Sequence, residues 1–181
     1  MTRVPLIDRD DTSGEVSRTL DHINSVFGTT PTMFRAVANS PAALVSMWTA
    51  FGAYGGGALG PAIGEQIAVA VANANSCEYC LAAHTALGRQ AGVSREALAA
   101  AQVGESDDPR TEALLRFAIA LVERRGQASD QQFEELRQLG WSDEEIVETI
   151  GQVALNVFTN YVNISLEVPV DFPAVELRPV G

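Results

Sequence analysis

Hydrophobic residues recur every three or four positions along most of the chain, which is the spacing of one face of an α-helix. The first such stripe, Val16, Leu20, Ile23 and Phe27, predicts a helix over residues 13–27. Stripes of the same kind, separated by glycine, proline, serine and asparagine, predict further helices over residues 33–38, 41–54, 62–72, 77–91, 95–101, 109–125, 130–139 and 143–165. Some of these segments are short, and none shows the strict alternation that is typical of a strand. We therefore expect an all-α protein of about eight helices.

Residues with strong capping preferences mark where several of these helices begin. Ser129-Asp130-Gln131-Gln132 and Ser142-Asp143-Glu144-Glu145 have the pattern of capping boxes, and Ser40-Pro41 places a capping residue before a proline. Outside the helices, we expect an extended lead over residues 1–13 and an irregular, proline-rich tail over residues 166–181. The chain has no fixed-period repeat and no linker, so we expect residues 1–181 to form a single helical domain.

Composition and charge narrow the classes of function. The 181 residues carry a formal net charge of −11, and 46% of them are hydrophobic. Such an acidic chain does not attract phosphates, so we expect no nucleic-acid partner. No run approaches the roughly 18 apolar residues of a membrane span, and the N-terminus lacks the apolar core of a signal peptide. We therefore expect no membrane association and a location in the cytoplasm.

The chain has two cysteines, Cys77 and Cys80, and His84 follows four residues after the second. In a reducing compartment, a pair with this spacing is more often catalytic or metal-binding than a permanent disulfide. We expect Ser76 to cap a helix that begins at Cys77, which places Cys77, Cys80 and His84 on one face. The free N–H groups and the dipole at a helix N-terminus favour a thiolate over a thiol.

Glu65 lies on the predicted helix that precedes the cysteine pair. If the two helices fold back on each other around residues 73–76, Glu65 and His84 come level, because each lies about eight residues from the turn at roughly 1.5 Å per residue. A carboxylate beside an imidazole fixes its tautomer and raises its basicity. The imidazole could then take a proton from Cys80.

The arrangement of Glu65, eleven residues, Cys77, two residues, Cys80, three residues and His84 resembles the signature of the alkylhydroperoxidase D (AhpD) branch of the carboxymuconolactone decarboxylase superfamily. The flanking residues 65–68 and 156–163 also resemble that family. The resemblance implies an all-helical, obligate homo-oligomer that reduces hydroperoxides.

The resemblance also implies a role for each residue of the signature. Cys80 would be the peroxidatic thiolate, Cys77 the resolving thiol, and Glu65 and His84 the proton relay. An external dithiol, of the lipoyl or thioredoxin type, would reduce the resulting disulfide. The best-known members carry a second histidine before the peroxidatic cysteine, where this chain has Tyr79. Tyrosine is no base near neutral pH, so we expect Tyr79 to support the site as a hydrogen-bond donor at most.

Three alternatives to a peroxidase remain open from the residues themselves. The pair could exchange disulfides with a protein or a small dithiol, without significant peroxidase activity. Zinc could be bound by Cys77, Cys80 and His84, with Glu65 as the fourth ligand that zinc requires. The chain could also be a non-catalytic helical interaction protein. The preferred interpretation requires neither an organic cofactor nor a metal, and we expect none.

Several other residues have both a functional and a structural interpretation. We expect His22 to be a solvated surface residue. The stripe of Leu44, Met47, Trp48 and Phe51 is more typical of a core than of a substrate pocket. A polar stripe on the last helix could contact a substrate, or bridge to a neighbouring helix or subunit; it consists of Asn156, Asn160 and Asn163. The narrow apolar stripes of so many short helices suggest that burial is completed in a homo-oligomer.

Overall fold

The computed structural model describes residues 2–179, and this part of the chain contains helices but no strand. The prediction of an all-α protein is confirmed, with nine α-helices within residues 2–179 where about eight were expected. The elements are η1 (a 3-10 turn, Arg9–Asp11), α1 (Gly14–Phe27), α2 (Thr32–Val37), α3 (Pro41–Gly55), α4 (Gly60–Ala74), α5 (Glu78–Gln90), α6 (Arg95–Ala101), α7 (Pro109–Glu123), α8 (Asp130–Gln138) and α9 (Asp143–Leu166). The lead is therefore not extended throughout, because η1 interrupts it.

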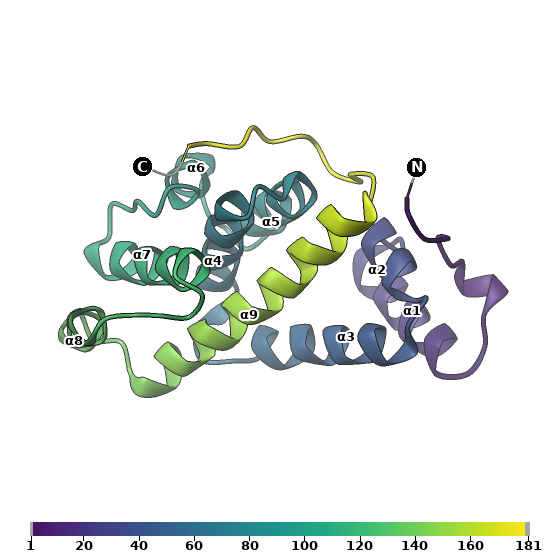
Figure 1. Cartoon of the computed structure of the whole chain (residues 1–181), viewed down its shortest axis with the longest axis horizontal. Helices are drawn as coiled ribbons and strands as arrows, with labels where there is room; N and C mark the ends of the chain where they lie inside the picture. The colour runs from purple at the N-terminus through teal and green to yellow at the C-terminus, as the bar shows by residue number, and fades with distance from the viewer. Residues whose placement is uncertain (1, 180–181) are drawn as a thin grey trace.

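Helix α4 lies at the centre of the fold and packs against α5, α7 and α9 (Figure 1). Its residues from Ile67 to Ala72 are almost completely buried, so this part of the helix is hydrophobic on all sides. Alanine alternates with larger residues in this stretch, and its small side chain lets the neighbouring helices pack closely against α4. Helices α7 and α8 lie at one end of the molecule, and α1 and α2 lie at the other. Helix α9, the longest, runs diagonally across both groups.

The caps predicted at Ser40, Ser129 and Ser142 are present, and Ser94 and Asp108 cap two further helices. The side chains of Ser40, Ser94 and Asp108 accept hydrogen bonds from the first turns of α3, α6 and α7. Ser129 and Ser142 both form complete capping boxes, in which the third helical residue reaches back to the cap. These bonds satisfy N–H groups that a helix leaves unpaired at its start.

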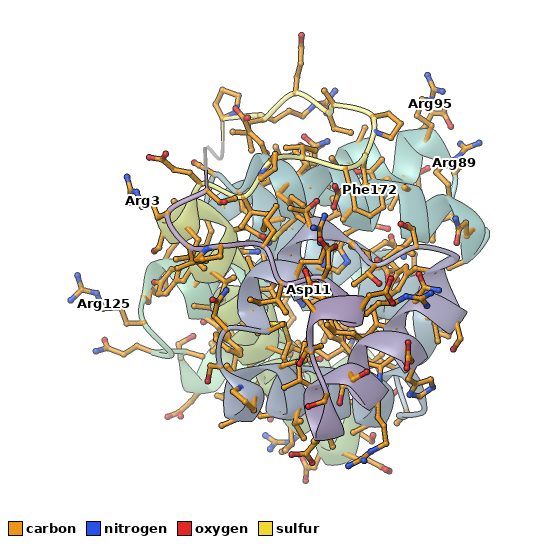
Figure 2. The ribbon with its side chains drawn as sticks, turned by 90° about the vertical axis from the view of Figure 1, so that its right-hand side faces the viewer. Arg3, Asp11, Arg89, Arg95, Arg125 and Phe172 are labelled. Atoms are coloured by element: carbon orange, nitrogen blue, oxygen red, sulfur yellow. The ribbon has the colours of Figure 1, made fainter. Side chains whose placement is uncertain are left out.

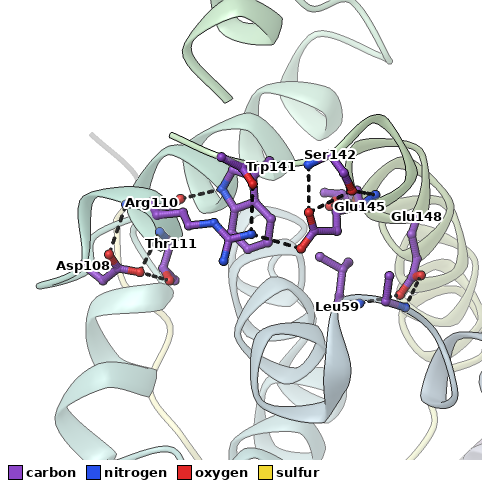
Figure 3. A network of polar contacts seen from close by, with 11 residues as sticks. Leu59, Asp108, Arg110, Thr111, Trp141, Ser142, Glu145 and Glu148 are labelled. Carbon is purple, nitrogen blue, oxygen red and sulfur yellow. Dashed lines mark hydrogen bonds and ion pairs between the residues drawn. The ribbon is translucent and has the colours of Figure 1, made fainter. Parts of the chain in front are cut away.

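A polar network joins the start of α9 to α7 and to α4 (Figure 3). The guanidinium of Arg110 lies 3.6 Å from the centre of the Trp141 ring and donates a hydrogen bond of 3.0 Å to Glu145. The Trp141 indole N–H donates in turn to the Arg110 carbonyl, at 2.9 Å. One turn further along α9, the Glu148 carboxylate accepts from the backbone N–H of Ala58 at 2.7 Å, just before α4. This network fixes α9 against the helix that carries Glu65.

Beyond α9, residues 168–179 form an irregular tail that returns across α5 towards α6 (Figure 1). Its end is held by Asn73, which donates to the Arg178 carbonyl at 2.9 Å and accepts from the Arg178 N–H at 2.8 Å. Of the helices described, none combines the length and the hydropathy that a bilayer crossing requires.

Candidate active site

Helices α4 and α5 form the hairpin that the sequence predicted, and it brings Glu65 next to His84. The Glu65 Oε2 and His84 Nδ1 atoms are 2.8 Å apart. His84 is buried, and the Glu65 side chain is mostly so. The carboxylate holds the proton of the ring on Nδ1, so that Nε2 is the nitrogen left for proton exchange.

Both cysteines lie in the first turn of α5 and are free thiols with 1% and 2% of their surface exposed, for Cys77 and Cys80 respectively. Ser76 does not cap this helix, because its backbone adopts a left-handed conformation (φ 56°) that ends the turn from α4. Cys77 is the cap instead, and its Sγ accepts the N–H of Cys80 at 3.4 Å. The predicted cap therefore lies one residue too early.

The two thiols differ in acidity although they share one helical turn. The hydrogen bond from Cys77 lowers the pKa of Cys80 to about 6, and the charge of His84 and the amide of Asn163 act in the same direction, against the effect of burial. The same hydrogen bond and burial raise the pKa of the Cys77 thiol. These shifts favour the thiolate at Cys80 and the thiol at Cys77.

His84 is the positive partner of this thiolate. Burial alone would lower its pKa, but the Glu65 carboxylate outweighs burial and raises the pKa of the imidazole. The three side chains therefore lie in the order Glu65, His84 and Cys80, with the pKa of the imidazole raised and the pKa of the Cys80 thiol lowered. These opposite shifts favour an anionic nucleophile beside a protonated acid.

The asparagine stripe of α9 faces α5, which answers one question that the sequence left open. The Asn163 amide lies 3.1 Å from Cys80 Sγ and 3.2 Å from Met33 Sδ. Asn160 accepts a hydrogen bond of 2.8 Å from Asn75, at the turn between α4 and α5. Thr159, which the sequence did not single out, lies 4.0 Å from Cys80 Sγ. The asparagines of α9 thus contact the cysteine helix and the turn before it. Their spacing along the helix was the signal that the sequence offered for this contact.

Cys80 opens into a cavity of about 260 Å³ with mostly apolar walls. Leu44 and Met47 belong to the core as predicted, whereas Trp48 and Phe51 of the same stripe line this cavity. The remaining aromatic walls come from four parts of the chain and are Phe27, Phe34, Tyr79 and Phe172. The cavity fits an apolar organic molecule with one polar end near Cys80 and His84.

Tyr79 is a hydrogen-bond donor, as expected, but its partner lies in the tail. Its hydroxyl donates to Asp171 Oδ2 at 2.7 Å. Burial and this carboxylate both raise the pKa of the Tyr79 phenol, which keeps it neutral. Asp171 and Phe172 were not identified from the sequence, because a proline-rich tail has no periodicity that would place it against α5.

The other candidate residues lie away from this chemistry. His22 is exposed as predicted, and its Nδ1 accepts the indole N–H of Trp48 at 3.0 Å. Within residues 2–179, no three side chains of histidine, cysteine, aspartate or glutamate are arranged to hold a metal ion.

Comparison with known proteins gives both a sequence match and a fold match. Residues 42–106, which contain the whole signature, match the carboxymuconolactone decarboxylase family. No curated protein sequence matches the chain.

Among solved structures, the chain resembles a peroxidase-related protein with an alkylhydroperoxidase AhpD core from Ralstonia eutropha JMP134, at 23% identity and a TM-score of 0.86, over 94% of this chain and 92% of that one. It resembles a peroxidase-related protein from Silicibacter sp. TM1040 at 23% identity and a TM-score of 0.81, over 92% and 89% of the two chains. It also resembles the debrominase Bmp8, at 20% identity and a TM-score of 0.81, over 94% and 93%. A cysteine-to-alanine variant of that debrominase has been solved with 2,3,4-tribromopyrrole bound.

At these identities the likeness establishes a common fold. The family match covers the helices that carry Glu65, both cysteines and His84. Residues 42–106 are therefore similar to the carboxymuconolactone decarboxylase family, and the chain has the fold of the peroxidase-related proteins with an alkylhydroperoxidase AhpD core.

Proposed function

We propose that this protein is a thiol-dependent peroxidase that reduces organic hydroperoxides, with Cys80 as the nucleophile. The observation that carries the proposal is that Glu65, His84 and Cys80 lie next to one another at an apolar cavity, with the pKa of the Cys80 thiol lowered. A thiolate is the reactive form of cysteine, and an adjacent acid is needed to protonate the leaving oxygen. Cys77 lies one helical turn away, where it can resolve the oxidised product.

In the first step, the Cys80 thiolate attacks the terminal oxygen of the hydroperoxide. An S–O bond forms, the O–O bond breaks, and the alkoxide takes a proton from the His84 imidazolium to leave as an alcohol. The Glu65 carboxylate stabilises His84 before the transfer and fixes the orientation of the ring.

In the second step, Cys77 attacks the sulfenic sulfur of Cys80. The S–S bond forms, and the hydroxyl leaves with the proton of Cys77 as water. An external dithiol of the lipoyl or thioredoxin type then reduces the disulfide by exchange through a mixed disulfide. We place this cycle in the cytoplasm, where dithiol reductants are available.

The test is rapid-mixing oxidation of the reduced protein by cumene hydroperoxide, with the sulfenic acid and the disulfide measured by mass spectrometry. We expect Cys80→Ser to abolish peroxide consumption. The Cys77→Ser variant should consume one equivalent and stop. A wild-type protein that reacts no faster than free cysteine, but exchanges rapidly with a small disulfide, would favour the disulfide oxidoreductase instead.

A second candidate is the reductive removal of halogen from an aromatic ring, and the aromatic walls of the cavity favour it. Here the Cys80 thiolate would take the halogen, the ring carbon would keep the electron pair of the broken bond, and His84 would protonate that carbon. Cys77 would then displace halide to form the same disulfide. Release of bromide from a brominated pyrrole, measured by ion chromatography beside peroxide consumption, separates the two activities.

A further inference from the structure

The tail contacts the cysteine helix at Asp171, which is hydrogen-bonded to two different elements. Asp171 Oδ2 accepts from the Tyr79 hydroxyl and from the backbone N–H of Thr32, both at 2.7 Å. Its Oδ1 accepts from the Thr32 hydroxyl. The backbone N–H of Met33 also points to the Tyr79 oxygen, at 3.4 Å. One carboxylate thus joins the tail to the starts of α2 and α5.

Phe172, the next residue, forms part of the cavity that contains Cys80. Its ring meets the Tyr79 ring edge to face, with the centroids 5.9 Å apart and the planes at 88°. Figure 2 shows Phe172 on the tail segment that crosses the helices. The ring is thus held by its neighbour Asp171 on one side and by Tyr79 on the other.

The rest of the tail limits how far this segment can move. Val168 is buried at the end of α9, and its N–H donates to the Asn163 carbonyl at 3.0 Å. At the other end, Asn73 makes both backbone hydrogen bonds to Arg178. Between these two points, the Asp171 carboxylate provides the hydrogen bonds that hold Phe172 against the cavity.

Tyr79 is the residue that couples this tail to the cysteine pair. Because its phenol is neutral and its proton is given to Asp171, Tyr79 is not available as a base for Cys80. Tyr79 lies between the two cysteines in the chain, so its hydrogen bond to Asp171 holds the tail close to Cys80.

We propose that Phe172 is a specificity-determining residue of the Cys80 cavity, which favours substrates with an aryl or similarly bulky apolar group, and that Asp171 and Tyr79 are positioning residues that hold it there. The substrate class in this inference rests on the proposed peroxidase function. The positioning of Phe172 rests on the contacts above and is measurable without peroxide.

The experiment compares the rate constants of Cys80 oxidation by cumene hydroperoxide and by hydrogen peroxide. In Phe172→Ala, the rate constant for cumene hydroperoxide divided by that for hydrogen peroxide should fall about tenfold. The reason is that the substitution removes an apolar wall that only the aryl substrate contacts. Asp171→Asn and Tyr79→Phe should lower the same ratio by about threefold or more, since they loosen the ring without removing it. The pH profile of the hydrogen peroxide reaction, which reports on Cys80 and His84, should keep its midpoint in all three variants.

The matched control is Glu176→Gln, which removes an exposed carboxylate from the same tail and should leave the ratio unchanged. Thermal melting of each variant reports whether it folds. If Phe172→Ala alters both rates by the same factor, or Tyr79→Phe shifts the pH profile, the inference is overturned and Tyr79 belongs to the proton relay.

Comparing the rates at which iodoacetamide and its N-benzyl derivative alkylate Cys80 tests the inference independently of the proposed function. Alkylation of Cys80 requires only its thiolate. A protein without peroxidase activity should still lose its preference for the benzyl reagent in Phe172→Ala and in Asp171→Asn. An unchanged preference would overturn the positioning of Phe172 even in an active peroxidase.

Discussion

Cys77 and Cys80 are chemically identical and three residues apart, yet their surroundings move their pKa values in opposite directions. The sequence predicted that both would benefit from a helix N-terminus, and it predicted Glu65 and His84 as their partners. It did not predict how Asn163, from a helix more than 80 residues further along, would contact only one of the sulfurs. Which thiol ionises is therefore decided by tertiary contacts that the local pattern does not contain.

The low pKa of Cys80 predicts a pH profile for its reactivity. With a pKa of about 6, about nine tenths of Cys80 is thiolate at pH 7, so its alkylation rate should rise between pH 5 and 7 and then level off. Asn163→Leu removes a donor that favours the thiolate, so the midpoint should move to higher pH and the rate at pH 6 should fall severalfold. Iodoacetamide labelling followed by mass spectrometry measures both. An unchanged midpoint in Asn163→Leu would mean that this amide does not stabilise the charge.

At the scale of elements, the helices were the most predictable feature, because their stripes and caps are local. The boundaries of α6, α8 and α9 follow directly from Ser94, Ser129 and Ser142. The start of α5 was wrong by one residue, since the preceding turn requires a left-handed residue at Ser76. Propensity favours serine as a cap, but the geometry of the hairpin decides. Helix α4 begins at Gly60, and its N-cap residue, Leu59, makes no side-chain capping bond.

Glu148 takes the place of that missing cap and should be important for stability. Its carboxylate accepts from the N–H groups of Ala58 and Leu59, at 2.7 and 3.3 Å, and adds negative charge at the N-terminus of α4. We expect Glu148→Ala to lower the free energy of unfolding by about 1–2 kcal/mol, as measured by urea denaturation. Glu105→Ala, in the exposed loop before α7, is the control and should change it by less than about 0.5 kcal/mol. Equal effects of the two substitutions would contradict a capping role.

At the scale of the whole molecule, α9 has one face in the site and another in solvent. The outer face carries exposed apolar residues in two groups, each with a spacing of three: Val147 and Ile150 near its start, and Phe158, Tyr161 and Ile164 towards its end. Contiguous apolar patches of this kind mark interaction surfaces. We propose that this face packs against a second copy of the chain, in line with the homo-oligomer expected from the sequence.

Tyr161→Glu tests this surface, because Tyr161 is 59% exposed and lies near the end of the stripe closest to the site. A buried, unpaired carboxylate in an apolar interface is costly, so the oligomer should dissociate at micromolar concentration. Light scattering after size exclusion measures the mass, and circular dichroism checks that the helices remain. A wild-type monomer, or a Tyr161→Glu variant of unchanged mass, would count against the interface.

The cavity is the part of the molecule that the sequence predicted least. Its walls come from α1, α2, α3, α4, α5, α9 and the tail, so no single segment contains a pattern that describes it. Trp48 and Phe51 have the periodicity of core residues because one face of α3 serves both the core and the cavity. Helical spacing reveals which face is inside, but it does not distinguish a packed interior from a hollow one.

The sulfur of Cys77 serves as the cap of α5, and this has a consequence for the energetics of the redox couple. Cys77 Sγ accepts the N–H of Cys80, and Cys80 Sγ lies within reach of the Asn163 amide, so the folded protein stabilises its dithiol form. By thermodynamic linkage, contacts made in the dithiol form and weakened in the disulfide raise the reduction potential of the pair. The disulfide of the oxidised protein should therefore be reducible even by weakly reducing dithiols.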